Sequence, residues 1–336
     1  MTRRRSLYFT SLRQVEVRQE TLPDPAPDEA LVETICSAIS PGTEMLVYRG
    51  EFPNVPADSH IESLSKVFSY PLSYGYACVG RIKEIGEQVN QEWEGRLVFS
   101  FHPHCSHFLA KPESLLSVPE NVQPETAVFL PNMETAVNLV QDAAPVLGER
   151  AMVFGQGIVG LLTASLLKEF PLDALVTADR YSLRREASLD LGVKACLDPG
   201  DSDFHPSAKS LLNPDADFSI ELSGSPAALN DAITLTGFNG RIVIGSWYGQ
   251  KPAHLDLGGS FHRSRLKLIS SQVSTITPEL TGRWDKTRRF AVAWDAIRRI
   301  QPQKWITHRF SLEQAKEAYQ LLDKSPAEAI QVMLTY

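Results

Sequence analysis

One short stretch of the chain restricts its fold more than any other: an apolar run that breaks into a glycine-rich turn. Residues 151–154 have the character of a buried strand, the following residues read Gly-Gln-Gly-Ile-Val-Gly, and residues 161–167 continue as a helix. Gly155 permits a tight turn, Gly157 leaves no side chain between the backbone and a ligand, and Gly160 lets helix and strand pack closely. The stretch therefore predicts a strand, a turn and a helix whose N-terminus can bind a phosphate group.

A carboxylate follows the next predicted strand. Residues 174–178 read as this strand, and Asp179 comes directly after it. In a dinucleotide-binding unit this position, about 20 residues past the glycines, accepts the two hydroxyls of the adenosine ribose. The predicted nucleotide contacts in this region are Gly155, Gln156, Gly157, Ile158, Val159, Gly160, Asp179 and Arg180.

The same carboxylate favours NAD as the cofactor, because it repels the 2′-phosphate of NADP. Arg180 is expected to cover the adenine ring rather than to hold a phosphate. Arg184 and Arg185 keep NADP open as an alternative, since guanidinium groups can bind a 2′-phosphate.

Composition narrows the class of partner. The chain has 336 residues and a net charge of -7, and no basic stripe is long enough to neutralise several phosphates, so nucleic acid is excluded as a partner. No apolar run reaches the roughly 18 residues that a membrane span needs, and the basic start is not followed by the apolar core of a signal peptide. The four cysteines show no Cys-x-x-Cys spacing, which fits a reducing cytoplasm. We expect a cytoplasmic protein that acts on a small molecule.

The hydrophobic periodicity changes twice along the chain. Residues 1–130 contain strand-like segments separated by turns rich in Pro and Gly, and they predict a mainly antiparallel, barrel-like β domain. In residues 131–276 strands and helices alternate, which is typical of a doubly wound parallel sheet of the Rossmann type in an α/β fold. Residues 277–336, with predicted helices at 284–300 and 312–322 and a final strand at 330–334, are expected to complete the β domain.

This order of domains and several motifs resemble the medium-chain dehydrogenase/reductase superfamily over essentially the whole chain. Residues 71–80 (Pro-Leu-Ser-Tyr-Gly-Tyr-Ala-Cys-Val-Gly) are similar to the Pro-x-x-x-Gly-His-Glu-x-x-Gly segment of that superfamily, and Glu134-Thr-Ala is similar to its helix near the nicotinamide, which implies a role for Thr135. Residues 305–310 resemble its C-terminal segment before the last helix. Residues 39–50 are also similar to the Ser-x-Gly-Thr-Glu stretch of the bacteriochlorophyllide a dehydrogenase group.

Two departures from the superfamily concern its metal. Zinc-dependent members hold the catalytic ion with a Cys before Gly-Thr-Asp and with the His of Gly-His-Glu, and the matching positions here are Pro41 and Tyr76. A catalytic zinc site needs three protein ligands, so the loss of two predicts a zinc-independent protein with no bound metal. The four-cysteine lobe that carries structural zinc in many relatives is also missing.

Without zinc, the oxygen of the substrate still needs a proton and a partner for its developing charge. The resemblance places Thr43 at the relay hydroxyl of the family and Tyr76 where a zinc ligand would face the substrate. Tyr76 can equally be an aromatic that fills the volume of a lost metal site. Glu44 is expected either to orient Thr43, to pair with an Arg or to remain solvated. Asn132 and Glu134 either line a cleft or cap a helix.

Three further features have two interpretations each. The cluster His102, His104, Cys105 and His107 either binds a transition metal or is structural, and in an extended strand its members would face two sides. The basic run of Arg283, Lys286, Arg288 and Arg289 either attracts an acidic substrate or forms the solvated side of a helix. Residues 53–70 are either a lid over the site or a surface insertion.

The sequence therefore predicts a zinc-independent, NAD(H)-dependent oxidoreductase that interconverts an alcohol and a ketone, with Thr43 and Tyr76 at the reacting oxygen. The alternatives are a conjugate reductase of enones or quinones and a non-catalytic dinucleotide-binding sensor. Ser223 and Gly245, which follow later strands of the predicted sheet, are expected at its ligand-binding edge. Residues 266–270 read as the last, unprotected strand, so a homodimer formed through this strand is expected.

Overall fold

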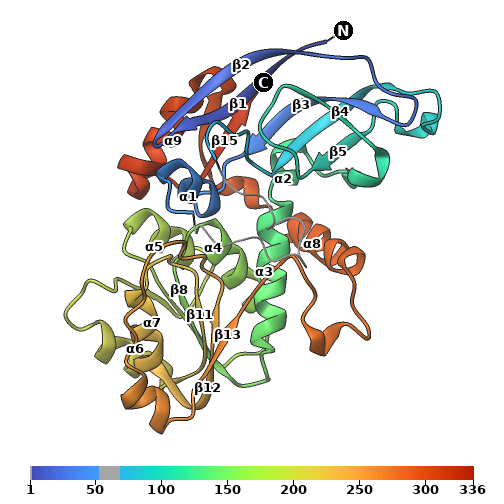
Figure 1. Cartoon of the computed structure of the whole chain (residues 1–336). Helices are drawn as coiled ribbons and strands as arrows, with labels where there is room; N and C mark the ends of the chain where they lie inside the picture. Colours follow the sequence, from blue (N-terminus) through green and yellow to red (C-terminus); the bar gives the residue numbers. More distant parts are fainter. Residues whose placement is uncertain (1, 53–68) are drawn as a thin grey trace. The chain divides into compact units, whose positions relative to one another are not determined.

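The structure is a computed structural model that describes residues 2–52 and 69–336, so most of the segment 53–70 lies outside the described residues. The chain divides into two compact units, the first formed by residues 1–131 and 301–336 and the second by residues 132–300 (Figure 1). The first boundary between the units, at residue 131, lies one residue from the expected boundary at residue 130. Residues 277–300, which were expected to belong to the β domain, instead belong to the second unit. Their helix α8 (Lys286–Ile300) is held there by contacts of Lys286 and Arg289 with Glu134.

A mixed sheet forms the centre of the first unit, with strand order β14-β15-β3-β4-β5-β7, and β6 also pairs with β3. Its neighbouring strands are antiparallel except for β14 and β15. The predicted antiparallel β domain is therefore confirmed, with one parallel pair at its C-terminal edge. The strands are β3 (Ala30–Ala38), β4 (Cys78–Ile85), β5 (Leu97–Ser100), β6 (His107–Ala110), β7 (Leu116–Ser117), β14 (Ile306–Ser311) and β15 (Gln331–Thr335).

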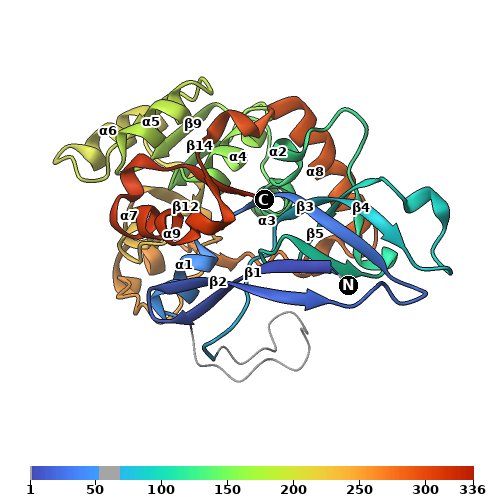
Figure 2. The same cartoon turned by 90° about the horizontal axis from the view of Figure 1, so that it is seen from above.

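A separate two-stranded ribbon begins the chain. Strands β1 (Thr2–Ser11) and β2 (Gln14–Leu22) pair antiparallel, and Figure 2 shows them running side by side. Alternate residues of β1, including Leu7 and Phe9, are buried against helices α1 (Thr43–Arg49) and α9 (Ala315–Lys324). The ribbon thus closes a core that joins the start and the end of the chain.

A parallel sheet with strand order β10-β9-β8-β11-β12-β13 forms the second unit. All six strands were expected from the sequence, and the predicted doubly wound fold is confirmed. Apolar strands suit this position because helices cover both faces of such a sheet. The strands are β8 (Arg150–Phe154), β9 (Ala174–Ala178), β10 (Ala195–Leu197), β11 (Ala216–Glu221), β12 (Thr236–Ile244) and β13 (Lys267–Ser270).

Helices connect these strands. Helix α4 (Ile158–Leu167), which follows the glycine turn, is apolar on all sides and almost wholly buried, as expected for a helix packed between a sheet and another helix. No helix in residues 2–52 and 69–336 is both long and apolar enough to cross a membrane. The other helices are α2 (Pro124–Ala127), α3 (Leu130–Ala143), α5 (Ser182–Leu189), α6 (Phe204–Leu212) and α7 (Ala227–Leu235).

Candidate functional site

The glycine turn between β8 and α4 has the backbone geometry that its sequence predicts. Gly155 has a φ of 88°, and a Cβ atom there would lie 2.6 Å from the backbone of Leu222. A Cβ atom at Gly160 would lie 1.9 Å from the carbonyl oxygen of Gly155. A Cβ atom at Gly157, by contrast, would meet Arg184 Nη1 at 3.8 Å, an ordinary van der Waals distance. Because neither Gly155 nor Gly160 tolerates a side chain, the turn keeps the first amides of α4 accessible at a helix N-terminus, where an anion is stabilised.

Gln156 has its side chain turned inward. Its amide group donates to the carbonyl of Gly155 at 2.9 Å and accepts from the Ser188 hydroxyl at 3.0 Å, and the residue has no exposed surface. Gln156 therefore offers a ligand only its backbone. The side chain ties the turn to helix α5.

Asp179 lies at the carboxyl end of β9, where the sequence analysis expected a ribose-binding acid. One carboxylate oxygen accepts from the backbone N–H of Gln156 at 2.7 Å and the other from that of Tyr181 at 2.9 Å. Each carboxylate oxygen can accept a further hydrogen bond. The acid thus fixes the glycine turn relative to β9 while it retains the capacity to bind hydroxyls.

Arginines surround this carboxylate in different ways. The guanidinium groups of Arg180 and Arg184 lie over the Tyr181 ring, 5.2 and 4.9 Å from its centre, whereas Arg185 pairs with Asp198 at 2.7 Å. Burial lowers the pKa of Arg184. Of the two arginines that left NADP open, Arg185 is therefore engaged within the protein, and Arg184 lies nearer the glycine turn, with its Nη1 3.8 Å from the position of a Cβ at Gly157.

Glu221 organises the next two loops at the same edge of the sheet, and the sequence analysis overlooked it. Fully buried at the end of β11, it accepts from the backbone and hydroxyl of Ser223 and from the Tyr248 phenol. Its backbone carbonyl accepts from the N–H of Gly245 at 3.0 Å. The signal was present, since an acid at the end of the mainly apolar run Phe218–Ile220 must find donors when it is buried.

Tyr76, Ser40 and Thr43 lie together in the first unit. The Tyr76 hydroxyl donates to Ser40 Oγ at 2.6 Å, and the backbone N–H of Thr43 donates to the same oxygen at 3.3 Å. Burial raises the pKa of the Tyr76 phenol, and hydrogen bonds to Ser40 and Thr43 oppose that rise. The structure thus unites the two predicted catalytic hydroxyls and adds Ser40, which sequence reasoning missed.

Glu44 is neither solvated nor paired with an Arg, so two of the three expectations for it were wrong. It is fully buried, and one carboxylate oxygen accepts from the backbone N–H of Ser40 at 2.9 Å. The other oxygen lies 3.0 Å from His104 Nε2 and accepts from the Tyr319 hydroxyl. Through the backbone of Ser40, Glu44 therefore fixes the turn that leads into α1, where Thr43 is the first residue.

The network continues beyond His104. The His104 Nδ1 atom lies 2.7 Å from the Ser37 hydroxyl, which in turn lies 2.7 Å from the phenol of the last residue, Tyr336. Burial raises the pKa values of Tyr319 and Tyr336 well above their usual range, so both remain protonated. A chain of polar groups thus runs from Tyr336 through Ser37 and His104 to Glu44, which binds the backbone of Ser40.

The histidines and the cysteine of residues 102–107 do not converge. His104 points toward Glu44, His102 is stacked on Phe108, and His107 Nε2 lies 3.9 Å from a Glu33 oxygen. The expectation that these side chains would face two sides of a strand was wrong. Residues 101–106 form an irregular segment, and Cys105 lies against His102. Within the ranges 2–52 and 69–336, no three His, Cys, Asp or Glu side chains form a group that could hold a metal ion.

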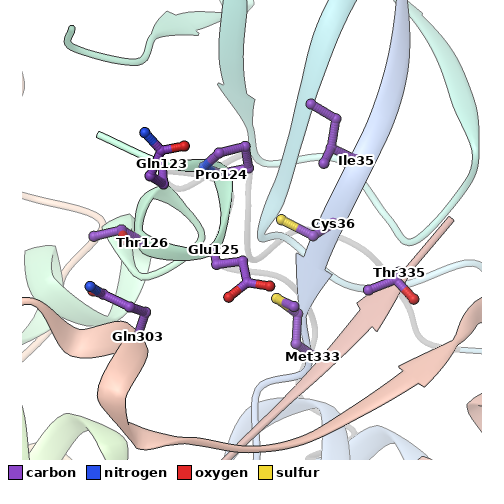
Figure 3. A pocket seen from close by; sticks show the side chains of 9 residues that line it. All are labelled: Ile35, Cys36, Gln123, Pro124, Glu125, Thr126, Gln303, Met333 and Thr335. Carbon is purple, nitrogen blue, oxygen red and sulfur yellow. The ribbon is translucent and has the colours of Figure 1, made fainter. Parts of the chain in front are cut away.

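A pocket of about 390 Å³ lies elsewhere in the first unit. Figure 3 shows the Glu125 carboxylate and the sulfur atoms of Cys36 and Met333 on its wall. Glu125 is paired with Arg309 at 2.7 Å, and burial raises the pKa of the Cys36 thiol to about 12, which keeps that thiol unreactive at neutral pH. None of the predicted catalytic residues lines this pocket. Its wall consists of Ile35, Cys36, Gln123, Pro124, Glu125, Thr126, Gln303, Met333 and Thr335.

Comparison with known proteins gives one family match and many relatives. The family model of zinc-binding dehydrogenases matches residues 159–291. An L-threonine 3-dehydrogenase of Xanthomonas campestris pv. campestris (strain B100) is 21% identical over 341 residues, which cover 93% of this chain and 94% of the relative.

Solved structures share the fold along the whole chain. An alcohol dehydrogenase (rspB) of Escherichia coli CFT073 complexed with NADH has a TM-score of 0.80 and 19% identity, with 100% of both chains covered. A dehydrogenase of Sinorhizobium meliloti 1021 bound to NADP has a TM-score of 0.78 and 18% identity, again with 100% of both chains covered. At this level of identity the structural likeness establishes the fold alone.

Proposed function

We propose that this chain is an oxidoreductase of the medium-chain dehydrogenase/reductase superfamily and that it uses NAD(H) without zinc to interconvert an alcohol and a ketone on a small or medium-sized organic substrate. The observation that carries the proposal is the cluster of Tyr76, Ser40 and Thr43, in which the Tyr76 hydroxyl, at a position where the resemblance implies a zinc ligand, is bonded to Ser40 beside Thr43. A nicotinamide cofactor is supported by related structures that contain NADH or NADP. The preference for NAD and the independence from zinc are the new parts of the proposal.

Hydroxyl groups can perform the proton chemistry that this reaction requires. Hydride transfer to a ketone leaves negative charge on the substrate oxygen, and a donor aimed at that oxygen lowers the barrier. Because burial raises its pKa, the Tyr76 phenol stays protonated at neutral pH. Tyr76 would turn its one O–H proton from Ser40 to the substrate oxygen and transfer it there, and Ser40, held by the N–H of Thr43, would donate its own hydroxyl proton in a hydrogen bond to the phenolate until solvent returns the proton.

The residues at the former zinc positions do not suit the metal. Pro41 has no donor atom, and the Tyr76 hydroxyl is bonded to Ser40. Zinc in proteins is bound by Cys, His, Asp or Glu side chains. We therefore assign no step of the reaction to a metal ion.

A substrate panel tests the proposed reaction. Nicotinamide absorbance should change with secondary alcohols or ketones and stay constant with enones and quinones. Activity confined to enones or quinones would instead identify a conjugate reductase. Cofactor binding without turnover on any substrate of the panel would favour the sensor.

Asp179 is expected to set the cofactor preference. NAD(H) should bind more tightly than NADP(H), and Asp179→Ser should narrow the ratio of the two dissociation constants by about tenfold, because it removes the charge that repels the 2′-phosphate. The substitution also removes an acceptor for the N–H groups of Gln156 and Tyr181, so both affinities should fall. The ratio, measured by fluorescence titration, isolates the electrostatic effect. Equal affinities in the unmodified protein would contradict the assignment.

We also propose a homodimer formed through the parallel sheet. Strand β13 lies at the edge of this sheet and, among residues 2–52 and 69–336, pairs only with β12, and an open strand edge tends to pair with another chain. Light scattering should therefore report twice the mass of the chain at micromolar concentration. A monomeric mass at that concentration would rule the dimer out.

A further inference from the structure

Arg289 on helix α8 is the largest fully buried side chain among the described residues. Its Nε and Nη2 atoms donate to Glu134 Oε1 at 3.1 and 3.0 Å. Its Nη1 donates to Asn138 Oδ1 and, at 3.0 Å, to the carbonyl of Thr275, and Nη2 donates to the carbonyl of Val273. All five N–H donors of the guanidinium therefore have an acceptor.

These contacts show that both interpretations given above for the basic run of residues 283–289 are wrong for Arg289. Arg289 neither attracts a substrate nor faces solvent, and Glu134 neither lines a cleft nor caps a helix, because the two form a buried ion pair. Lys286 joins the pair by donating to Glu134 and, at 3.0 Å, to the carbonyl of Val273. Removing such a pair from water costs free energy, so stability alone does not explain why it is present.

The guanidinium fixes a particular piece of backbone. Residues 271–275 leave the carboxyl end of β13, and Arg289 binds the carbonyls of Val273 and Thr275 in this segment. Helix α3 holds the start of the same segment, since Asn138 donates to the Ser271 hydroxyl at 2.8 Å. Side chains from two helices thus define the path of a loop that has no regular structure of its own.

The position of this loop follows from the direction of the sheet. Dinucleotides bind across the carboxyl ends of parallel strands, with one half on each side of the point where strand order reverses. Asp179 at β9 and the glycine turn after β8 assign the adenosine and the phosphates to one side of this point. The nicotinamide half must then lie toward β11, β12 and β13, where residues 271–275 begin.

We propose that Arg289 is a positioning residue that holds backbone 271–275 as a wall of the nicotinamide half of the cofactor site. This inference rests on the proposed use of a nicotinamide cofactor. Arg289 does not touch the cofactor in this account. It acts through the carbonyl groups of Val273 and Thr275. The planar guanidinium of an Arg can bind both carbonyls at once, whereas the ammonium group of a Lys cannot.

Two ligands that differ in the nicotinamide test the assignment. Arg289→Lys keeps a positive charge beside Glu134 but loses the simultaneous hydrogen bonds to the two carbonyls. The dissociation constant of NADH should therefore rise about tenfold. The dissociation constant of ADP-ribose, which lacks the nicotinamide, should stay within about twofold. Fluorescence titration of NADH and calorimetry of ADP-ribose give the two values on the same protein sample.

Two further variants exclude a general loss of structure. Arg288→Met changes the neighbouring exposed arginine, whose guanidinium donates to the carbonyl of Arg283 and lies over the Trp284 ring, and should leave both affinities unchanged. Glu134→Leu combined with Arg289→Met removes both buried charges, which folds tolerate far better than the loss of one, and should weaken NADH alone.

The outcomes separate this inference from the proposed function. Selective loss of NADH affinity in both Arg289 variants supports the positioning role. An equal loss for NADH and ADP-ribose, or no loss for either, would overturn that role alone. Unmodified protein that binds ADP-ribose but not NADH would overturn the proposed cofactor and this inference with it.

Discussion

Tyr76→Phe is expected to lower turnover about a hundredfold or more, the usual effect of removing one donor aimed at developing charge. The substitution keeps the ring and its packing against Tyr74, whose ring centre lies 6.3 Å away. It removes only the hydroxyl that donates to Ser40. Cofactor affinity should hardly change, because the predicted nucleotide contacts belong to the second unit. Steady-state kinetics on one substrate, together with NADH titration, measure both quantities.

Matched variants define what the result means. Tyr74→Phe makes the same chemical change on the neighbouring ring and should leave turnover close to that of the unmodified protein, whereas Thr43→Val should lower it. If Tyr76→Phe and Thr43→Val both retain full turnover, the two residues serve packing rather than catalysis. Metal analysis of the purified protein completes the test, since stoichiometric zinc with chelator-sensitive activity would refute the metal-free mechanism.

Local patterns were sufficient to predict the nucleotide-binding unit. The strand, turn and helix around Gly155 and Gly160 depend on neighbours in sequence, and each glycine is required by a contact that its Cβ would violate. The alternation of apolar segments then predicted the strands of the parallel sheet, because buried strands must be apolar on both faces. The path of residues 277–300 was not predictable in this way, since it depends on a buried pair between residues 134 and 289.

The first unit was predicted less completely because its candidate site is assembled from distant parts of the chain. Thr43 and Tyr76 came from the resemblance, but Ser40, which joins them, has no motif of its own. His104 stands 60 residues from Glu44, and Tyr319 stands 275 residues from it. No periodicity in the sequence indicates which buried donor will meet which buried acid, since tertiary packing decides the pairing.

The buried pair of Glu44 and His104 gives the second large prediction. Both side chains are fully buried, with 3.0 Å between a Glu44 oxygen and His104 Nε2. His104→Leu should reduce the stability of the first unit by about 1–3 kcal/mol, because it removes one of the hydrogen-bond partners of a fully buried carboxyl group. Gly75 supports this view, since a Cβ atom there would lie 2.6 Å from the His104 ring and the fold therefore keeps that space for the imidazole.

Hydrogen exchange should locate this loss, because two units need not unfold in one step. Protection should fall most at the Ser40 amide, which donates to Glu44. His107→Leu is the matched control, since His107 is partly exposed and lies 3.9 Å from its nearest acid, and its cost should stay below about 1 kcal/mol. Glu44→Leu combined with His104→Leu should cost less than the sum of the single changes, because neither buried group is then left without the other. If the His104→Leu and His107→Leu proteins are equally stable, the contact between Glu44 and His104 contributes nothing to stability. The turn before Thr43 would then need another support.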